Sequence, residues 1–254
     1  MYHWVGSYLD RIKYTGDLEP TVQKLSNLQQ AHVYAVPFED LDIHYGTALS
    51  LDLDHLREKV IINNRGGFCY ELNYLFGSLL DTLGYQVNYI SARVFNEYTG
   101  LEGPEFDHMG LLVTLGEKWL VDVGFGGRAF TQPLSIVKPD IQIDPAGFFR
   151  VDEVSNDRFQ VFRSLDRSEF LPLYNFSLDK QNIENFYAEC QWKQTDPKSH
   201  FVKNKICTMA TPKGRKSILN DLFSIREGKI KSTFEITDLQ HERKILSDHF
   251  NIDL

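Results

Sequence analysis

Apolar residues recur at helical spacing in the first third of the chain. Val22, Leu25 and Leu28 share one face of a predicted helix. A longer helix is predicted from about Phe68 to Gly84, because a glycine suits the left-handed conformation that ends many helices. The apolar stripe of this helix consists of Leu72, Leu75, Phe76, Leu79, Leu80 and Leu83. These patterns predict a helical bundle at the start of the chain.

From about residue 85 the apolar period changes to two, which is typical of strands. The predicted strands are Tyr85–Val94, Met109–Leu115, Trp119–Val123, Phe148–Val151 and Phe159–Phe162. Repeated short strands separated by polar turns favour a barrel or a sandwich.

The last part of the chain mixes both periods. Its predicted elements are a helix at Asn182–Gln194, strands at Phe201–Met209 and Lys216–Phe223, and a final helix opening at Thr237. We therefore expect an α+β fold of three regions that pack as one unit: residues 1–84 helical, residues 85–190 mainly strands, and residues 191–254 mixed.

The composition is that of an ordinary globular protein. Hydrophobic residues make up 42% and charged residues 24% of the 254 positions, which argues against a disordered or coiled-coil chain. No apolar stretch approaches the roughly 18–20 residues of a membrane span. The start of the chain lacks the layout of a signal peptide, so we expect a soluble, cytoplasmic protein. A net charge of −8 argues against nucleic acid as a partner.

Positive charge is concentrated in one segment, residues 192–216. It holds one acidic residue, Asp196, and seven basic ones: Lys193, Lys198, Lys203, Lys205, Lys213, Arg215 and Lys216. Such a segment either attracts an anionic small molecule or forms a solvated face.

The chain has three cysteines, Cys69, Cys190 and Cys207, which are too few and too scattered for a disulfide framework or a zinc site. Cys69 follows Gly66-Gly67 and falls in the first turn of a predicted helix. A helix N-terminus favours a thiolate and offers N–H groups to an oxyanion. A buried, inert thiol is the alternative interpretation of a lone cysteine.

A nucleophilic thiol needs a base, and the base needs a partner that orients it. His108 begins a strongly apolar strand, and Asp122 is an acid embedded in another. Asp107 adjoins His108, but successive strand residues point to opposite faces. Each residue alone could be a satisfied polar group of the core. Together with Cys69, His108 and Asp122 fit a Cys–His–Asp relay.

The strand register presents a difficulty for this relay. Direct opposition of His108 and Asp122 would centre the hairpin turn on residue 115, two residues before Glu117, where the turn signal lies. A β-bulge or strong twist is therefore expected between the two residues.

The glycines of Gly124-Phe125-Gly126-Gly127 follow Asp122 closely. Successive N–H groups in such a turn can form an anion-binding nest. A corner of a barrel would need the same glycines.

Two segments, residues 65–73 (RGGFCYELN) and 121–127 (VDVGFGG), closely resemble the arylamine N-acetyltransferase family. Residues 37–41 (PFEDL), 196–201 (DPKSHF) and 211–215 (TPKGR) are also similar to that family. The resemblance spans nearly the whole chain. It implies a helical bundle at 1–84, a β-barrel at 85–190 and an α/β lid at 191–254 with a linking helix. This is a core like that of cysteine proteases and transglutaminases.

The resemblance implies that acetyl-CoA is the acyl donor, without a metal or prosthetic group. Acetyl would pass through a Cys69 thioester to arylamines, arylhydrazines or arylhydroxylamines, as in xenobiotic metabolism. His108 would be the base and Asp122 the orienting acid. The partners would be CoA and a small aromatic amine or hydrazine, with neither nucleic acid nor membrane.

The remaining site residues also come from the resemblance. Gly124, Gly126 and Gly127 would cradle the CoA pyrophosphate, and the basic segment would meet its other phosphates. The aromatic acceptor would be framed by Phe38, Phe125 and Phe201. The chain departs from the family at Asp40, where asparagine is common.

Two other functions fit the same residues. A cysteine amidase or transglutaminase-like acyl transferase would use the triad on an amide. A non-catalytic protein that binds aromatic ligands would not need Cys69.

Overall fold

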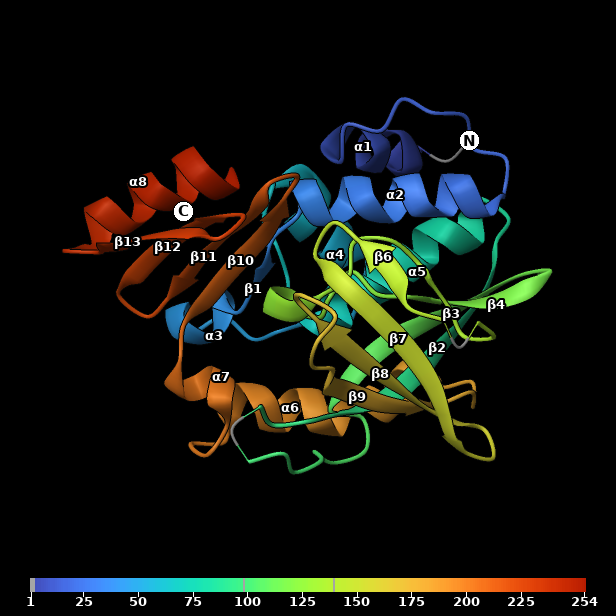
Figure 1. Ribbon diagram of the computed structural model, residues 1–254. Helices are drawn as coiled ribbons and strands as arrows, with labels where there is room; N and C mark the ends of the chain where they lie inside the picture. Colours follow the sequence, from blue (N-terminus) through green and yellow to red (C-terminus); the bar gives the residue numbers. More distant parts are fainter. Residues whose placement is uncertain (1–2, 98, 139) are drawn as a thin grey trace.

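The computed structural model describes residues 3–97, 99–138 and 140–254 (Figure 1). Its α-helices are α1 (His3–Arg11), α2 (Val22–Ala35), α3 (Leu41–Tyr45), α4 (Leu53–Leu56), α5 (Cys69–Thr82), α6 (Tyr187–Thr195), α7 (His200–Lys203) and α8 (Leu239–Phe250). Three further turns are the π-helix η1 (Arg57–Ile62) and the 3₁₀-helices η2 (Gly126–Arg128) and η3 (Ile183–Phe186). None of the helices in this part of the chain has the length and hydropathy needed to cross a membrane.

The largest sheet has eight strands in the order β5-β4-β3-β2-β9-β8-β7-β6. These strands are β2 (Gln86–Val94), β3 (His108–Leu115), β4 (Glu117–Val121), β5 (Leu134–Ser135), β6 (Gln142–Asp144), β7 (Gly147–Ser155), β8 (Arg158–Ser164) and β9 (Leu171–Ser177). The two edge strands are bridged by a side chain, because Gln142 accepts from the Ser135 N–H at 2.7 Å and donates to its carbonyl at 2.9 Å. These bonds join the edges, so that the sheet curves into a near-closed barrel.

A second sheet of five strands has the order β1-β10-β11-β12-β13. Its strands are β1 (Phe38–Glu39), β10 (Ile206–Thr211), β11 (Gly214–Leu219), β12 (Leu222–Glu227) and β13 (Ile230–Glu235). Strand β1 comes from the helical part of the sequence and pairs with β10 through Phe38↔Thr208 and Glu39↔Cys207. The helical first region and the C-terminal sheet are thus joined by backbone pairing between β1 and β10 (Figure 1).

The α+β fold class predicted from the sequence is confirmed, with two differences in the last region. Residues 201–203 belong to α7, because the Ser199 hydroxyl accepts the Phe201 N–H at 3.2 Å and caps a short helix. The strand predicted over Lys216–Phe223 is broken at Asn220, whose φ of 52° makes a tight turn between β11 and β12. The division into three regions stays a prediction.

The largest apolar core lies around α5 and joins the helices to the barrel. Leu72, Leu75, Phe76, Leu79 and Leu80 of α5 are fully buried, as the predicted stripe required. The same core contains Met109, Leu111 and Val113 of β3 and Val121 and Val123 around the end of β4. Helix α5 therefore packs on the strands that carry His108 and Asp122.

Candidate active site

The start of α5 is held by a buried carboxylate. Cys69 is the first residue of α5, and the N–H of Phe68 before it donates to Glu71 Oε2 at 2.7 Å. Lys59 Nζ lies 2.9 Å from each oxygen of Glu71 and 2.7 Å from Asp42 Oδ2. Glu71 has no exposed surface. Its ion pair with Lys59 compensates the buried charge, and its hydrogen bond from Phe68 fixes the first turn of the helix.

The loop before Cys69 belongs to the same charge network. Arg65 donates to both oxygens of Glu39 at 3.0 and 3.1 Å and to Asp42 Oδ1 at 2.8 Å. The N–H of Leu41 also donates to Glu39 Oε2, at 2.8 Å. The position of Cys69 is thus set by backbone and charge contacts on both sides of it.

His108 and Asp122 form a buried pair, with His108 Nε2 at 2.7 Å from Asp122 Oδ2. The β3–β4 ladder runs in one register from Leu111↔Val121 to Leu115↔Glu117. Continued in that register, the ladder would place position 124 opposite His108. Asp122 is two residues away and therefore lies diagonally across on the same face. The expected bulge is replaced by this diagonal pairing.

The Asp122 carboxylate accepts three further hydrogen bonds. Oδ1 accepts Asn73 Nδ2 and the Gly124 N–H, both at 2.9 Å, and Oδ2 accepts the Tyr174 hydroxyl at 3.1 Å. With four donors, a fully buried carboxylate stays satisfied as an anion. It can therefore stabilise a charged imidazole on His108.

Asn73 links the helix that begins with Cys69 to the His108–Asp122 pair. It lies one turn after Cys69, donates to the Met109 carbonyl at 2.7 Å and accepts the Val123 N–H at 3.0 Å, in addition to its bond with Asp122. Neither Asn73 nor Tyr174 was singled out from the sequence. An asparagine at i+4 from Cys69 inside an apolar helix was a usable signal for the first, whereas Tyr174 is brought in by long-range pairing.

Cys69 lies against the turn that follows Asp122. A Cβ on Gly124 would lie 2.7 Å from the Cys69 carbonyl oxygen and 2.9 Å from its Cα, so only glycine fits there. Within the residues that the structure describes, the Cys69 thiol forms no hydrogen bond with His108. The structure brings the three predicted catalytic residues into one region and joins two of them directly.

Cys69 is only 5% exposed. This burial raises the pKa of its thiol well above the usual value. The charges of Cys190, Asp107 and Asp122 raise it further, whereas the Lys193 ammonium lowers it. The helix start alone favours the thiolate, but desolvation is the larger effect. Burial therefore opposes ionisation of the Cys69 thiol in the free protein.

Lys193 is buried on α6, although the sequence placed it in the basic segment. Its ammonium bonds Asp107 Oδ1, lies 3.8 Å from Glu189 Oε1 and sits 5.3 Å from the centre of the Phe201 ring. Asp107 faces away from His108, as strand alternation predicted. The segment is thus not a uniformly solvated face.

Aromatic rings surround this region in two groups. Phe38 and Phe201, both predicted to frame an acceptor, lie 6.2 Å apart, and Phe68 contacts them at 5.6 and 4.5 Å between ring centres. Phe125 lies 5.1 Å from the His108 ring and 4.9 Å from Tyr174. Two of the three predicted rings therefore pack together with Phe68, whereas Phe125 packs on the imidazole.

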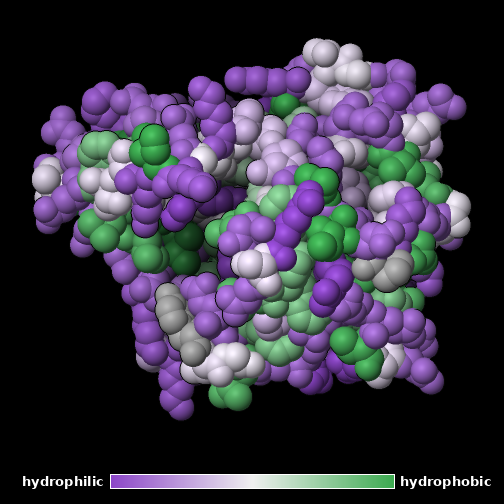
Figure 2. Space-filling view, viewed as in Figure 1, coloured by the Kyte–Doolittle hydropathy of each residue, from purple (hydrophilic) through white to green (hydrophobic). Residues whose placement is uncertain are grey.

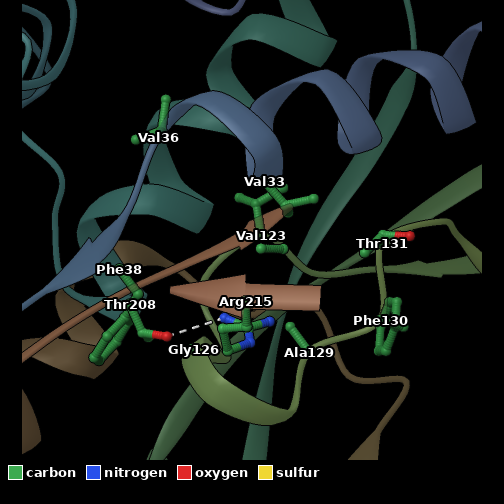
Figure 3. Close-up of a pocket in the computed structure, with 11 residues that line it drawn as sticks. Val33, Val36, Phe38, Val123, Gly126, Ala129, Phe130, Thr131, Thr208 and Arg215 are labelled. Atoms are coloured by element: carbon green, nitrogen blue, oxygen red, sulfur yellow. Dashed lines mark hydrogen bonds between the residues drawn. The ribbon is translucent and has the colours of Figure 1, made fainter. Parts of the chain in front are cut away.

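The glycine turn borders a pocket between α2, β10, β11 and η2. Gly126 has a φ of 71° and packs on Phe38, whereas a Cβ on Gly127 would meet no atom within 4 Å. The pocket is a shallow hollow, partly open to solvent, with a cavity volume of about 20 Å³. Figure 3 shows Arg215 beside Gly126 at its base, bonded to the Thr208 hydroxyl at 3.2 Å.

A thiol at a helix start, backed by a buried His–Asp pair, is the arrangement of cysteine-dependent acyl transfer. The family model described as N-acetyltransferase matches residues 21–254. The chain belongs to the arylamine N-acetyltransferase family, whose members are acyltransferases.

Individual relatives agree with this assignment along the whole chain. The chain is 31% identical to the arylamine N-acetyltransferase pineal gland isozyme NAT-10 of Gallus gallus, over 97% of this chain and 93% of that one. The solved arylamine N-acetyltransferase of M. tuberculosis is 29% identical, with a TM-score of 0.90 over 98% of this chain and 93% of that one. The Mycobacterium marinum enzyme in complex with CoA is 29% identical, with a TM-score of 0.88 over 98% and 92%.

Proposed function

We propose that the protein transfers acetyl from acetyl-CoA to the amino group of an arylamine, arylhydrazine or arylhydroxylamine through a thioester on Cys69. The family supports acetyl transfer, and a relative that binds CoA supports the donor. The observation that carries the mechanism is the His108–Asp122 pair, attached to the helix of Cys69 through Asn73. Transfer in two half-reactions predicts ping-pong kinetics.

In the first half-reaction the Cys69 proton moves to Nδ1 of His108, since Nε2 is engaged by Asp122. The sulfur attacks the carbonyl carbon of the acetyl thioester, and N–H groups in the first turn of α5 receive the oxyanion. The bond from the carbonyl carbon to the CoA sulfur then breaks. CoA leaves as a thiol with the proton from His108, and acetyl remains on Cys69.

In the second half-reaction the amine nitrogen attacks the Cys69 thioester. His108 accepts the amine proton and returns it to the departing Cys69 sulfur. The Cys69 thiol is thereby regenerated for the next turnover. Phe38, Phe68 and Phe201 offer apolar contact to an aromatic acceptor on the thiol side.

Acetyl-CoA, the acyl donor, would lie along the glycine turn. Backbone N–H groups of Gly124, Gly126 and Gly127 are proposed to meet the CoA pyrophosphate. The N–H of Gly124 already serves Asp122, so Gly126 and Gly127 are the more open donors in the turn. We also propose a cytoplasmic setting, because the nucleophile must stay reduced and all three cysteines are free.

The test is intact-mass spectrometry after mixing with acetyl-CoA. The protein should gain one acetyl group at Cys69 and release CoA thiol, and an arylamine should then remove the acetyl as its N-acetyl product. Cys69→Ser should abolish the gain. An adduct on Cys190 or Cys207 would contradict the proposal. Binding of an aromatic ligand that survives iodoacetamide treatment, without acetylation, would favour the non-catalytic alternative.

A further inference from the structure

Three guanidinium groups on the strands have no carboxylate partner, and one of them, that of Arg215, lines the pocket beside the glycine turn. They belong to Arg163 on β8, Arg215 on β11 and Arg226 on β12, and none of them has an ion pair within 4.0 Å in the described residues. By contrast, Arg128 of the turn pairs with Glu97 at 3.6 Å.

Arg215 and Arg226 are directly opposite each other in the β11–β12 ladder. Residues opposite each other share a face of the sheet, and like charges in this arrangement repel. The face is identified by their neighbours. Lys216 reaches α8 on one side, where its ammonium lies 3.4 Å from the His249 carbonyl, whereas Arg215 bonds Thr208 on the other. Both arginines therefore lie on the face of the sheet turned away from α8, and Figure 3 shows Arg215 in the pocket.

The third arginine, Arg163, lies on β8 of the barrel, outside the pocket lining. Its Nη2 donates to the Ala146 carbonyl at 2.7 Å, and its buried Nε has no hydrogen-bond partner. The guanidinium lies 5.9 Å from the ring centre of Phe149, which contacts the pocket residue Phe130 at 5.7 Å. A buried guanidinium with an idle donor is a site prepared for an acceptor.

The charges of these arginines influence one another. Burial, and then the charge of Arg163, lower the pKa of Arg215 to about 10. Burial, with the charges of Arg128 and Arg226, lowers the pKa of Arg163, and Asp144 partly offsets this. The Asp144 carboxylate accepts its hydrogen bonds from Thr131, Gln132 and Ala146 rather than from these arginines.

We propose that Arg215 and Arg226, together with Arg163, form a binding site for phosphate groups beside the pocket that Arg215 lines. A phosphate accepts paired N–H groups from a guanidinium and cancels the repulsion between neighbouring cations. The identification of the ligand as CoA rests on the proposed function, whereas the phosphate chemistry rests on the arginines alone. Figure 2 shows the surface hollowed between the β10–β13 side and the barrel, where such a ligand can enter.

The test compares Arg215→Met and Arg226→Met with Arg243→Met, an exposed arginine on α8. Isothermal titration measures the affinity of wild type and variants for CoA, dephospho-CoA and inorganic pyrophosphate. We expect each pocket variant to weaken CoA about tenfold to a hundredfold, as the loss of a charged hydrogen bond does. Arg243→Met should bind like wild type.

The three ligands distinguish the phosphates. A loss that disappears with dephospho-CoA assigns the arginines to the 3′-phosphate, and a loss shared by pyrophosphate assigns them to a small-anion site. Unchanged affinity for all three ligands in both variants overturns the proposal. Arg226 is exposed on β12, so we expect Arg226→Met to fold. This variant therefore still tests the proposal if Arg215→Met does not fold.

An acetyl donor that carries no phosphate group tests the arginine site separately from the proposed function. p-Nitrophenyl acetate should acetylate Cys69 at the same rate in wild type and in the arginine variants, while acetylation by low acetyl-CoA slows. An equal loss with both donors would make the arginines structural and overturn the site. If wild type is acetylated by neither donor, the proposed function fails, while pyrophosphate binding still tests the arginines.

Discussion

Nε2 of His108 lies 2.7 Å from Oδ2 of Asp122, although the two residues are diagonal rather than opposite across β3 and β4. The chain leaves the ladder after Val121. There the Asp122 carboxylate accepts hydrogen bonds from the Asn73 side chain and the Gly124 N–H as well. The carboxylate is held by four donors before any substrate is present. Its charge is therefore available to His108 at every stage of the proposed reaction.

Asp122→Asn should lower turnover on the order of 10⁴-fold. An amide NH₂ facing Nε2 would place the histidine proton on Nδ1, which then could not accept the Cys69 proton. The measurements are steady-state turnover and the pH dependence of Cys69 alkylation by iodoacetamide.

Tyr174→Phe is the matched control, because it removes one hydrogen bond to Asp122 at 3.1 Å and keeps the carboxylate. Its expected loss is at most about tenfold. If Asp122→Asn stays folded and alkylates with the same pH midpoint as wild type, Asp122 is a structural acid.

Two glycines of one turn should respond differently to alanine. Gly124→Ala would place a Cβ 2.7 Å from the Cys69 carbonyl oxygen, and backbone cannot yield there as a flexible side chain would. We expect about 1–3 kcal/mol of destabilisation. Gly127→Ala meets open space and should change the unfolding free energy by less than about 0.5 kcal/mol. Urea unfolding measures both, and equal losses would show that Gly124 does not support Cys69.

The sequence predicted those parts of the site that depend on local patterns. The helix of Cys69 and the strands of His108 and Asp122 have long, regular apolar periods, and their cores are buried as expected. The Asn220 turn was missed because apolar residues continue on both sides of it, although Asn-Asp between two strands is itself a hairpin signal.

The rest of the site depends on contacts between distant segments. Tyr174 reaches Asp122 only because β9 lies beside β2 in the barrel. In the sequence, Lys193 is one of several lysines in the basic segment. Its burial follows from the packing of α6 against Asp107 and Phe201. Composition and spacing carry no information about such contacts, and the diagonal His108–Asp122 register was likewise set by where β4 ends.

Lys193→Met should make Cys69 less reactive. The ammonium is the strongest influence that lowers the pKa of this thiol, so its removal leaves the raising effects of burial and Asp107 unopposed. The pH midpoint of iodoacetamide alkylation should move upward. Loss of the buried pair with Asp107 should also cost about 3 kcal/mol of stability.

Lys193→Arg separates the two effects, since it keeps the charge and should keep the alkylation midpoint close to that of wild type even if packing suffers. Lys198→Met, at an exposed lysine of the same segment, should change neither quantity. A midpoint that is unmoved in a folded Lys193→Met protein would show that Lys193 serves structure alone.

Asp40→Asn should stabilise the protein, and more so as pH rises. Asp40 is fully buried, its Oδ1 accepts the Ile206 N–H at 2.7 Å, and its Oδ2 has no hydrogen-bond partner in the described residues. Burial, opposed by the Ile206 hydrogen bond and reinforced by the charge of Glu39, raises the pKa of Asp40 to about 8. An asparagine matches the neutral, protonated acid in shape and needs no proton.

The pH window follows from the two states of Asp40. In the unfolded chain the carboxyl ionises near its ordinary pKa of about 4, whereas in the folded protein it stays protonated up to about pH 8. Wild type therefore loses about 1.4 kcal/mol of stability per pH unit between these values, and the variant does not. The difference in unfolding free energy should be near zero at pH 4 and reach a few kcal/mol at pH 7. Urea unfolding from pH 4 to 8 measures it, with the exposed Asp221→Asn as control. A difference that is constant across this range would mean that Asp40 is ionised in the folded protein and has a partner there.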